Sequence, residues 1–154
     1  ADGGDAIGLA ANVLEKASLE KARQEILAKF GPCDILINGA GGNNPRGTTA
    51  NEYADKADLE SPEPGKFNFF NLDPAGISFV FNLNFIGTLL PSQVFAADMV
   101  EKGHGTILNI SSMNAFRPLT KIPVQHICRQ SNGVTAIGGD GVGEIAAHAH
   151  GKTI

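Results

Sequence analysis

Two hydroxyl-bearing residues, Ser111 and Ser112, stand where a short apolar segment of the chain ends. Residues 105–110 are rich in apolar and β-branched side chains and follow a Gly-His-Gly turn, which predicts a short buried strand. Ligands of an open parallel sheet bind beyond the carboxyl ends of its strands, so this serine pair is a candidate site. The alternative is that both serines only turn the chain.

A second candidate site is the turn Gly39-Ala40-Gly41-Gly42, which directly follows the apolar segment 34–38. Small residues at the end of a strand let a ligand lie against the backbone, where free N–H groups remain available to it. The ribose or nicotinamide of a cofactor would fit there. A tight turn without a ligand is the alternative.

The elements around these residues follow strand–helix–strand order. Residues 6–11 predict a strand, residues 34–38 predict another that is apolar on both faces, and a helix capped by Ser18 and ended by Gly31-Pro32 lies between them. The order predicts an α/β fold with a parallel sheet that helices cover on both sides. The apolar face of the helix comprises Leu19, Ala22, Ile26 and Phe30.

The middle of the chain predicts an excursion and then a long helix. Residues 43–74 contain four prolines and no sustained periodicity, so they predict a lid over a substrate or a mobile excursion. Residues 75–102 predict an apolar helix that Pro91 kinks. Its predicted buried face comprises Phe81, Leu83, Asn84, Gly87, Leu90, Val94 and Met99.

Composition excludes several classes of function. A formal net charge of −4 provides no basic patch for nucleic acid. Cys33 and Cys128 form no metal or disulfide framework, which favours a cytoplasmic protein, and we predict no metal site. The most apolar region, 77–90, contains Asn82 and Asn84 and is shorter than a bilayer requires, so no membrane span is expected.

Three motifs together resemble the short-chain dehydrogenase/reductase family. Residues 34–41 (Asp-Ile-Leu-Ile-Asn-Gly-Ala-Gly) resemble its Asn-Asn-Ala-Gly segment, residues 84–87 its Asn-x-x-Gly helix motif, and residues 109–112 its Asn-x-Ser-Ser strand end. The order and separations also match, over residues 6–124. The excursion and the segments 81–84 and 90–95 further resemble the D-mannonate oxidoreductase (fructuronate reductase-like) branch.

The resemblance implies a role for each matching residue. Ser112 corresponds to the catalytic serine on the substrate oxygen, and Asn84 to the asparagine that holds a water of the proton relay. Asn38, Gly39, Ala40 and Gly41 would line the cofactor ribose, and Asn12 and Val13 the adenine. The implied cofactor is NAD or NADP, the substrate is a small hydroxy or keto compound such as a sugar acid, and the full-length protein is expected to be a homo-oligomer.

The sequence also departs from the family pattern. Asn12 replaces the usual Asp and Gly39 a second Asn, and the first βαβ unit would lie before Ala1. Gln125 and Arg129 occupy the positions of the catalytic tyrosine and lysine. An amide cannot transfer the proton, and a guanidinium stays protonated, so a rate about 10²- to 10⁴-fold lower is expected.

We therefore divide the chain into a partial dinucleotide-binding domain, 1–124, and an atypical, poorly ordered tail, 125–154. Five glycines in 133–143 disfavour a packed helix there. A one-base shift of the codons allowed for 126–131 can encode Ser-Ala-Ala-Lys-Ala, which resembles the family, and the chain begins without Met. The alternatives are therefore a catalytically dead Rossmann-type binding or assembly subunit, or a truncated, frame-shifted product. Hydrolysis at Ser112 is less favoured, because the glycines of a nucleophile elbow are missing.

Overall fold

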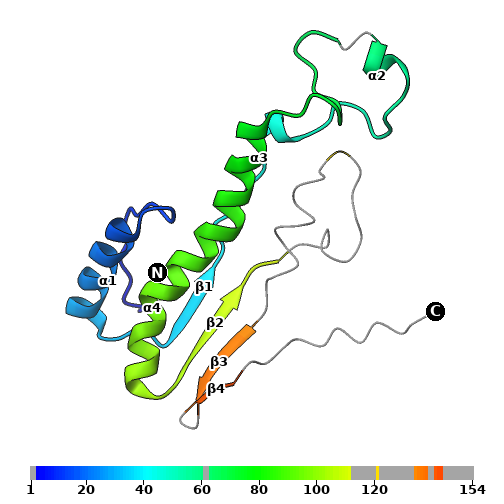
Figure 1. The fold of residues 1–154 in the computed structure, drawn as a ribbon. Helices are drawn as coiled ribbons and strands as arrows, with labels where there is room; N and C mark the ends of the chain where they lie inside the picture. Colours follow the sequence, from blue (N-terminus) through cyan, green and yellow to red (C-terminus); the bar gives the residue numbers. More distant parts are fainter. Residues whose placement is uncertain (1–2, 61–62, 112–120, 122–133, 139–140, 144–154) are drawn as a thin grey trace.

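The computed structural model describes residues 3–60, 63–111, 121, 134–138 and 141–143 (Figure 1). The first half contains α1 (Lys16–Phe30), β1 (Ile35–Asn38), η1 (Pro45–Gly47) and α2 (Ala57–Glu60). A continuous helical run follows, made of α3 (Pro74–Phe81), η2 (Asn82–Ile86) and α4 (Gly87–Lys102). The remaining strands are β2 (Gly105–Asn109), β3 (Val134–Gly138) and β4 (Gly141–Gly143).

The four strands form one sheet in the order β1-β2-β3-β4. The parallel pairing of β1 with β2, through the intervening helix, confirms the predicted α/β fold. β3 and β4 are antiparallel, so the tail contains two strands that were not predicted. The glycines that disfavour a helix do not prevent a hairpin, and the Val-Thr-Ala-Ile sequence of β3 has high β propensity.

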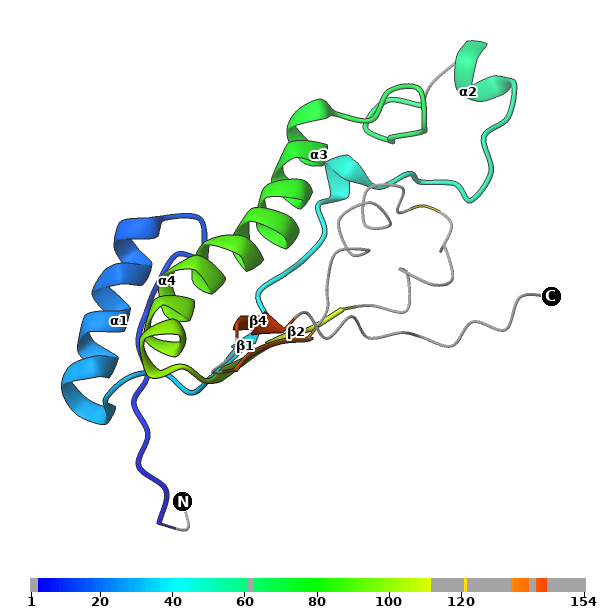
Figure 2. The ribbon, with the colours of Figure 1, turned by 60° about the horizontal axis from the view of Figure 1, so that its bottom comes forward.

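Helices α1 and α4 cover the same face of the sheet, as Figure 2 shows with the sheet nearly edge-on. Leu19 packs against Val94 and Phe95 between the two helices, and Met99 packs against Ile107 of β2. The opposite face exposes Ile35 and Ile37 by 65% and 61%. Within the described residues, the predicted helical cover on both sides is therefore present on one side only.

The start of the chain differs from the prediction. Residues 6–11 form no strand, because no neighbouring strand within the described part of the chain pairs with them. Helix α1 begins at Lys16, so Ser18 lies inside it and accepts a hydrogen bond from the Asn12 N–H instead of capping the helix. Phe30 is 45% exposed, although Leu19 and Ala22 are buried as predicted.

The long helix departs from regular α-helical hydrogen bonding at η2 as well as at Pro91. The Gly87 N–H donates to the Asn82 carbonyl five residues back, which is the π-helical pattern. Pro91 has no N–H for the Gly87 carbonyl, so the regular pattern is interrupted on both sides of Gly87. Asn84, Gly87, Val94 and Met99 are buried as predicted, whereas Phe81 is exposed.

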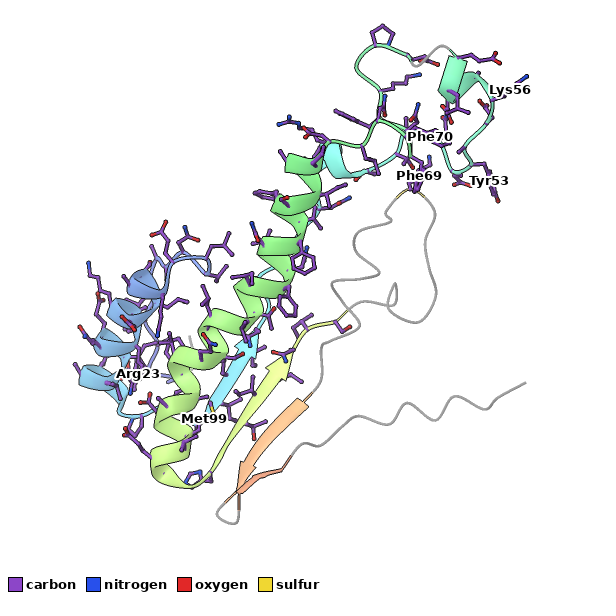
Figure 3. All side chains as sticks on the ribbon, viewed as in Figure 1. Arg23, Tyr53, Lys56, Phe69, Phe70 and Met99 are labelled. Carbon is purple, nitrogen blue, oxygen red and sulfur yellow. The ribbon has the colours of Figure 1, made fainter. Side chains whose placement is uncertain are left out.

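By length and composition alone, the helix Pro74–Lys102 could cross a membrane. Its packing indicates a core helix instead, because α4 contacts α1, β1 and β2. It also contains Asp98, which is 3% exposed and pairs with Arg23 of α1 (Figure 3). The hydrogen bond between the Arg23 Nε and the Asp98 Oδ1 is 2.9 Å long.

The Arg23–Asp98 pair predicts an acid-dependent loss of stability. The hydrogen bond from Arg23 lowers the pKa of Asp98, against the opposing effect of desolvation. A depressed carboxyl pKa stabilises the fold above the unfolded value of about 3.9, and this stabilisation is lost as pH falls through the folded value. We expect Asp98→Asn to lower the free energy of unfolding at neutral pH and to converge with wild type below about pH 4, in urea titrations. A difference that is constant with pH would contradict this.

The base of the excursion packs on α3 through two glycines. A Cβ added to Gly76 would lie 2.7 Å from the Arg46 carbonyl carbon and 2.8 Å from the Gly47 nitrogen. Asp73 caps α3 by accepting from the Ala75 N–H and also pairs with Arg46. The excursion is thus anchored where the long helix begins.

We expect Gly76→Ala to detach this anchor. Alanine favours a helix over glycine by about 1 kcal/mol, but a contact of this kind with backbone atoms forces the two segments apart and outweighs that gain. A net loss of about 1–2 kcal/mol is expected, with faster proteolysis confined to residues 43–73. Unchanged proteolysis would show that this contact does not hold the excursion.

The outer part of the excursion is organised around Asn68, which is buried. Its amide nitrogen donates to the Asp58 carbonyl, and its Oδ1 accepts from the Phe70 N–H. Phe69 and Phe70, which lie in edge-to-face contact, are exposed beside Tyr53 (Figure 3). A shallow pocket of about 100 Å³ lies within residues 50–68 and not at the strand ends. The Thr49 N–H donates to the Lys121 carbonyl, so the excursion contacts the chain beyond β2, and its lid role stays a prediction.

Candidate cofactor and substrate site

The carboxyl ends of β1 and β2 lie side by side, as the sequence predicts. Asn38 pairs with Asn109 in the parallel register, and the Ile110 N–H donates to the Asn38 carbonyl over 2.9 Å. The glycine turn therefore leaves β1 beside the segment that leads to Ser111. Ser112, Gln125 and Arg129 lie outside the described residues, so their predicted roles stay predictions.

The turn after β1 is exposed at Gly39, Ala40 and Gly41. A Cβ added to Gly39 would meet no atom of the described residues within 4 Å, so these residues leave open space beside the backbone at this point. This is the geometry in which a ligand can approach main-chain atoms closely.

Asn84 holds the end of the glycine turn. Its Nδ2 donates to the Gly42 carbonyl over 2.7 Å and to the Val80 carbonyl over 2.8 Å, while its Oδ1 accepts from the Gly42 N–H over 3.0 Å. Asn84 is 4% exposed and belongs to the π-helical segment η2. One N–H of Asn84 thus holds the turn at Gly42, and the other bonds back to the helix at Val80. Its predicted contact with a relay water stays a prediction.

Asn38, the last residue of β1, fixes the start of the same turn. Its side chain is buried, and its Nδ2 donates to the Asn109 Oδ1 over 2.8 Å and to the Ser92 hydroxyl over 2.9 Å. Because this amide bonds to both α4 and the end of β2, it orients the two strand ends. The predicted contact of Asn38 with a cofactor is not tested by this geometry.

Asn12 forms a local turn before α1, and its neighbour Val13 lies next to α4 at Gly87. The Asn12 Oδ1 accepts from the Leu14 N–H, and its Nδ2 donates to the Glu15 carboxylate, so the side chain organises the entry to α1. Val13 approaches Gly87, where an added Cβ would lie 3.0 Å from its Cγ2. The Asn12 oxygen can accept a second hydrogen bond, as the predicted adenine contact requires.

The described part of the site is polar but contains no proton-transfer group. Its hydrogen-bonded side chains include the amides of Asn38, Asn84 and Asn109 and the hydroxyls of Thr88 and Ser92. Amides and hydroxyls orient a ligand, whereas a proton relay near neutral pH needs a titratable group. No group of acidic, histidine or cysteine residues suited to a metal ion occurs in the described ranges.

Thr88 and Ser92 are the site residues that the sequence did not reveal. They follow Asn84 at spacings of four and eight, which places all three on one face of an otherwise apolar helix. This polar stripe was a usable signal. It was hidden because each residue alone is common on helices.

A model of the short chain dehydrogenase family matches residues 1–124. An uncharacterized oxidoreductase of Haemophilus influenzae is 56% identical over 121 residues, which cover 79% of this chain and 41% of the relative. The uncharacterized oxidoreductase UxuB of Bacillus subtilis is 42% identical over 131 residues, covering 85% of this chain and 45% of the relative. The chain thus spans less than half the length of these relatives.

Solved structures agree with these matches. A provisionally assigned D-mannonate oxidoreductase from Haemophilus influenza, solved with bound NAD, is 52% identical with a TM-score of 0.75, over 83% of this chain and 44% of that one. A provisionally assigned short-chain dehydrogenase/reductase from Burkholderia xenovorans is 22% identical with a TM-score of 0.65, over 83% and 43% of the two chains, which supports the fold alone.

Proposed function

Because the chain belongs to the short-chain dehydrogenase family, we propose that it serves NAD(P)-dependent oxidoreduction of a small hydroxy or keto compound. The observation that carries this proposal is the open, exposed glycine turn held beside two parallel strand ends by Asn84. A bound nicotinamide would supply the hydride acceptor or donor.

The residues of the chain have distinct roles in this proposal. The backbone of Gly39, Ala40 and Gly41 receives the cofactor ribose, since no side chain obstructs it, and Asn12 and Val13 lie at the adenine end. Ser112 holds the substrate oxygen as it changes between alcohol and carbonyl. Asn84 keeps the turn in place through both polar groups of Gly42.

We infer a sugar acid as the substrate class. The support is the 52% identity to the Haemophilus protein described as a D-mannonate oxidoreductase. The excursion would cover the substrate, a cytoplasmic location would suit the cofactor, and the full-length protein would be a homo-oligomer.

A second candidate function follows from Gln125 and Arg129. Without a tyrosine and a lysine at those positions, the chain would bind the cofactor but turn over slowly or not at all. It would then be a binding or assembly subunit, unless the tail from residue 125 results from a frame shift. Sequencing the source DNA tests the frame shift directly.

NADH binding tests the proposal. We expect NADH fluorescence to increase on titration with the chain, and Gly39→Val to weaken binding at least about tenfold because its side chain fills the space beside the turn. We expect the fold to tolerate this substitution, since no atom of the described residues lies within 4 Å of an added Cβ. Gly4→Val is the matched control, as Gly4 is equally unobstructed and far from the turn in sequence.

The outcomes separate the alternatives. Binding that Gly39→Val abolishes, together with NAD-dependent oxidation of D-mannonate, supports the oxidoreductase. Binding without turnover supports the binding subunit. Absence of NADH binding by the wild-type chain, or equal binding by Gly39→Val, contradicts the proposal.

A further inference from the structure

We propose that Ser92 is a positioning residue that links the ends of β1 and β2 to the glycine turn through the π-helical segment. Its place in a cofactor site rests on the proposed function, whereas the linkage itself rests on hydrogen bonds of the described residues. Ser92 lies on α4, about two helical turns beyond Asn84, and its hydroxyl bonds to Asn38 of β1 and to the Thr88 carbonyl.

The direction of each hydrogen bond at Ser92 is fixed by its single proton. The Ser92 hydroxyl donates to the Thr88 carbonyl over 2.8 Å, so it can only accept from Asn38. Asn38 in turn uses one N–H for Ser92 and the other for the Asn109 Oδ1. Ser92 therefore binds both strand ends through one buried amide.

The line of bonds continues toward the turn. The Thr88 hydroxyl donates to the Asn84 carbonyl over 3.0 Å, and the Asn84 side chain holds both polar groups of Gly42. Serine and threonine that bond back to the carbonyl four residues earlier bend or widen a helix. Here the hydrogen bonds from Thr88 and Ser92 to carbonyls four residues earlier lie next to the π-helical segment that contains Asn84.

Together with the backbone from Asn38 to Gly42, these bonds form a closed ring. The ring fixes the exposed residues Gly39, Ala40 and Gly41 at both ends: at Asn38 through Ser92, and at Gly42 through Asn84. A turn fixed at both ends presents its backbone in one conformation, so a cofactor does not have to order it on binding. Loss of the Ser92 hydroxyl would open the ring next to Asn38.

Amide hydrogen exchange tests this linkage. In Ser92→Ala we expect exchange of the Gly42 N–H to accelerate about tenfold relative to amides of α1, because Asn38 loses its partner and the ring opens. NADH affinity should fall about three- to tenfold. Ser92→Thr, which keeps the hydroxyl, should restore both values, and Ser78→Ala, at an exposed serine of the same long helix, should change neither.

A merely structural role would accelerate exchange throughout the chain rather than at Gly42. Thr88→Val, which removes only the hydroxyl on the Asn84 carbonyl, is measured in parallel and should give the same local signature. If either Ser92→Ala or Thr88→Val folds and its Gly42 N–H exchanges at the wild-type rate, the proposed linkage is wrong. If the wild-type chain does not bind NADH, the proposed function fails while the exchange result still decides the linkage.

Discussion

Gly105→Ala is expected to unfold much of the domain at temperatures where the wild-type chain is folded. A Cβ at Gly105 would lie 2.3 to 2.7 Å from the Cγ, Cβ and Sδ of Met99. Met99 is fully buried between α4 and the sheet (Figure 3), so it has no space into which to move. Overpacking of this kind costs about 3 kcal/mol or more, which is a large fraction of the stability of a small domain.

Urea unfolding followed by far-UV circular dichroism measures this effect. Gly8→Ala provides the control, because a Cβ at Gly8 would meet nothing within 4 Å. We expect the control to stay within about 0.5 kcal/mol of wild type. A midpoint for Gly105→Ala equal to that of Gly8→Ala would mean that α4 does not pack on the start of β2 as described.

The contacts of Gly105 and Gly76 show what the sequence could not predict. Each glycine lies where two segments of the chain pack closely together, and no sequence motif marks either place. The residues around Gly105 predict only a turn, and those around Gly76 predict only a helix. The clash partners become known only when α4 lies on β2 and η1 lies on α3. Periodicity predicts which element forms, but it does not predict which backbone comes within contact distance of it.

The strand ends illustrate the opposite case. The apolar segments before Gly39 and before Ser111 predicted two strands, and the parallel register of Asn38 with Asn109 confirms that their ends adjoin. Residues 6–11 have a similar composition but form no strand, because a strand also needs a neighbour to complete its hydrogen bonds. Composition was thus sufficient where the partner lies within the described chain.

Asn84→Leu is the second substitution with a large expected effect, because it removes three hydrogen bonds while keeping the volume of the side chain. The Val80 carbonyl would lose its partner at a buried position, and the Gly42 N–H and carbonyl at a half-buried one. An unsatisfied buried group costs about 1–3 kcal/mol, and the two half-buried groups of Gly42 cost less, so a total of about 2–4 kcal/mol is expected. The loss should appear in urea unfolding, and Gly42 should exchange its amide proton faster than the amides of α1 do.

Asn82→Leu is the matched control for Asn84→Leu, since Asn82 belongs to the same π-helical segment but is exposed. It should leave both the unfolding midpoint and the Gly42 exchange close to wild type. Equal effects of the two substitutions would mean that any leucine in this segment destabilises the chain, whether or not it replaces the residue that bonds to Gly42. A stable Asn84→Leu chain with protected Gly42 would contradict the assignment of Asn84 as the residue that holds the turn, because the turn would then keep its conformation without the amide.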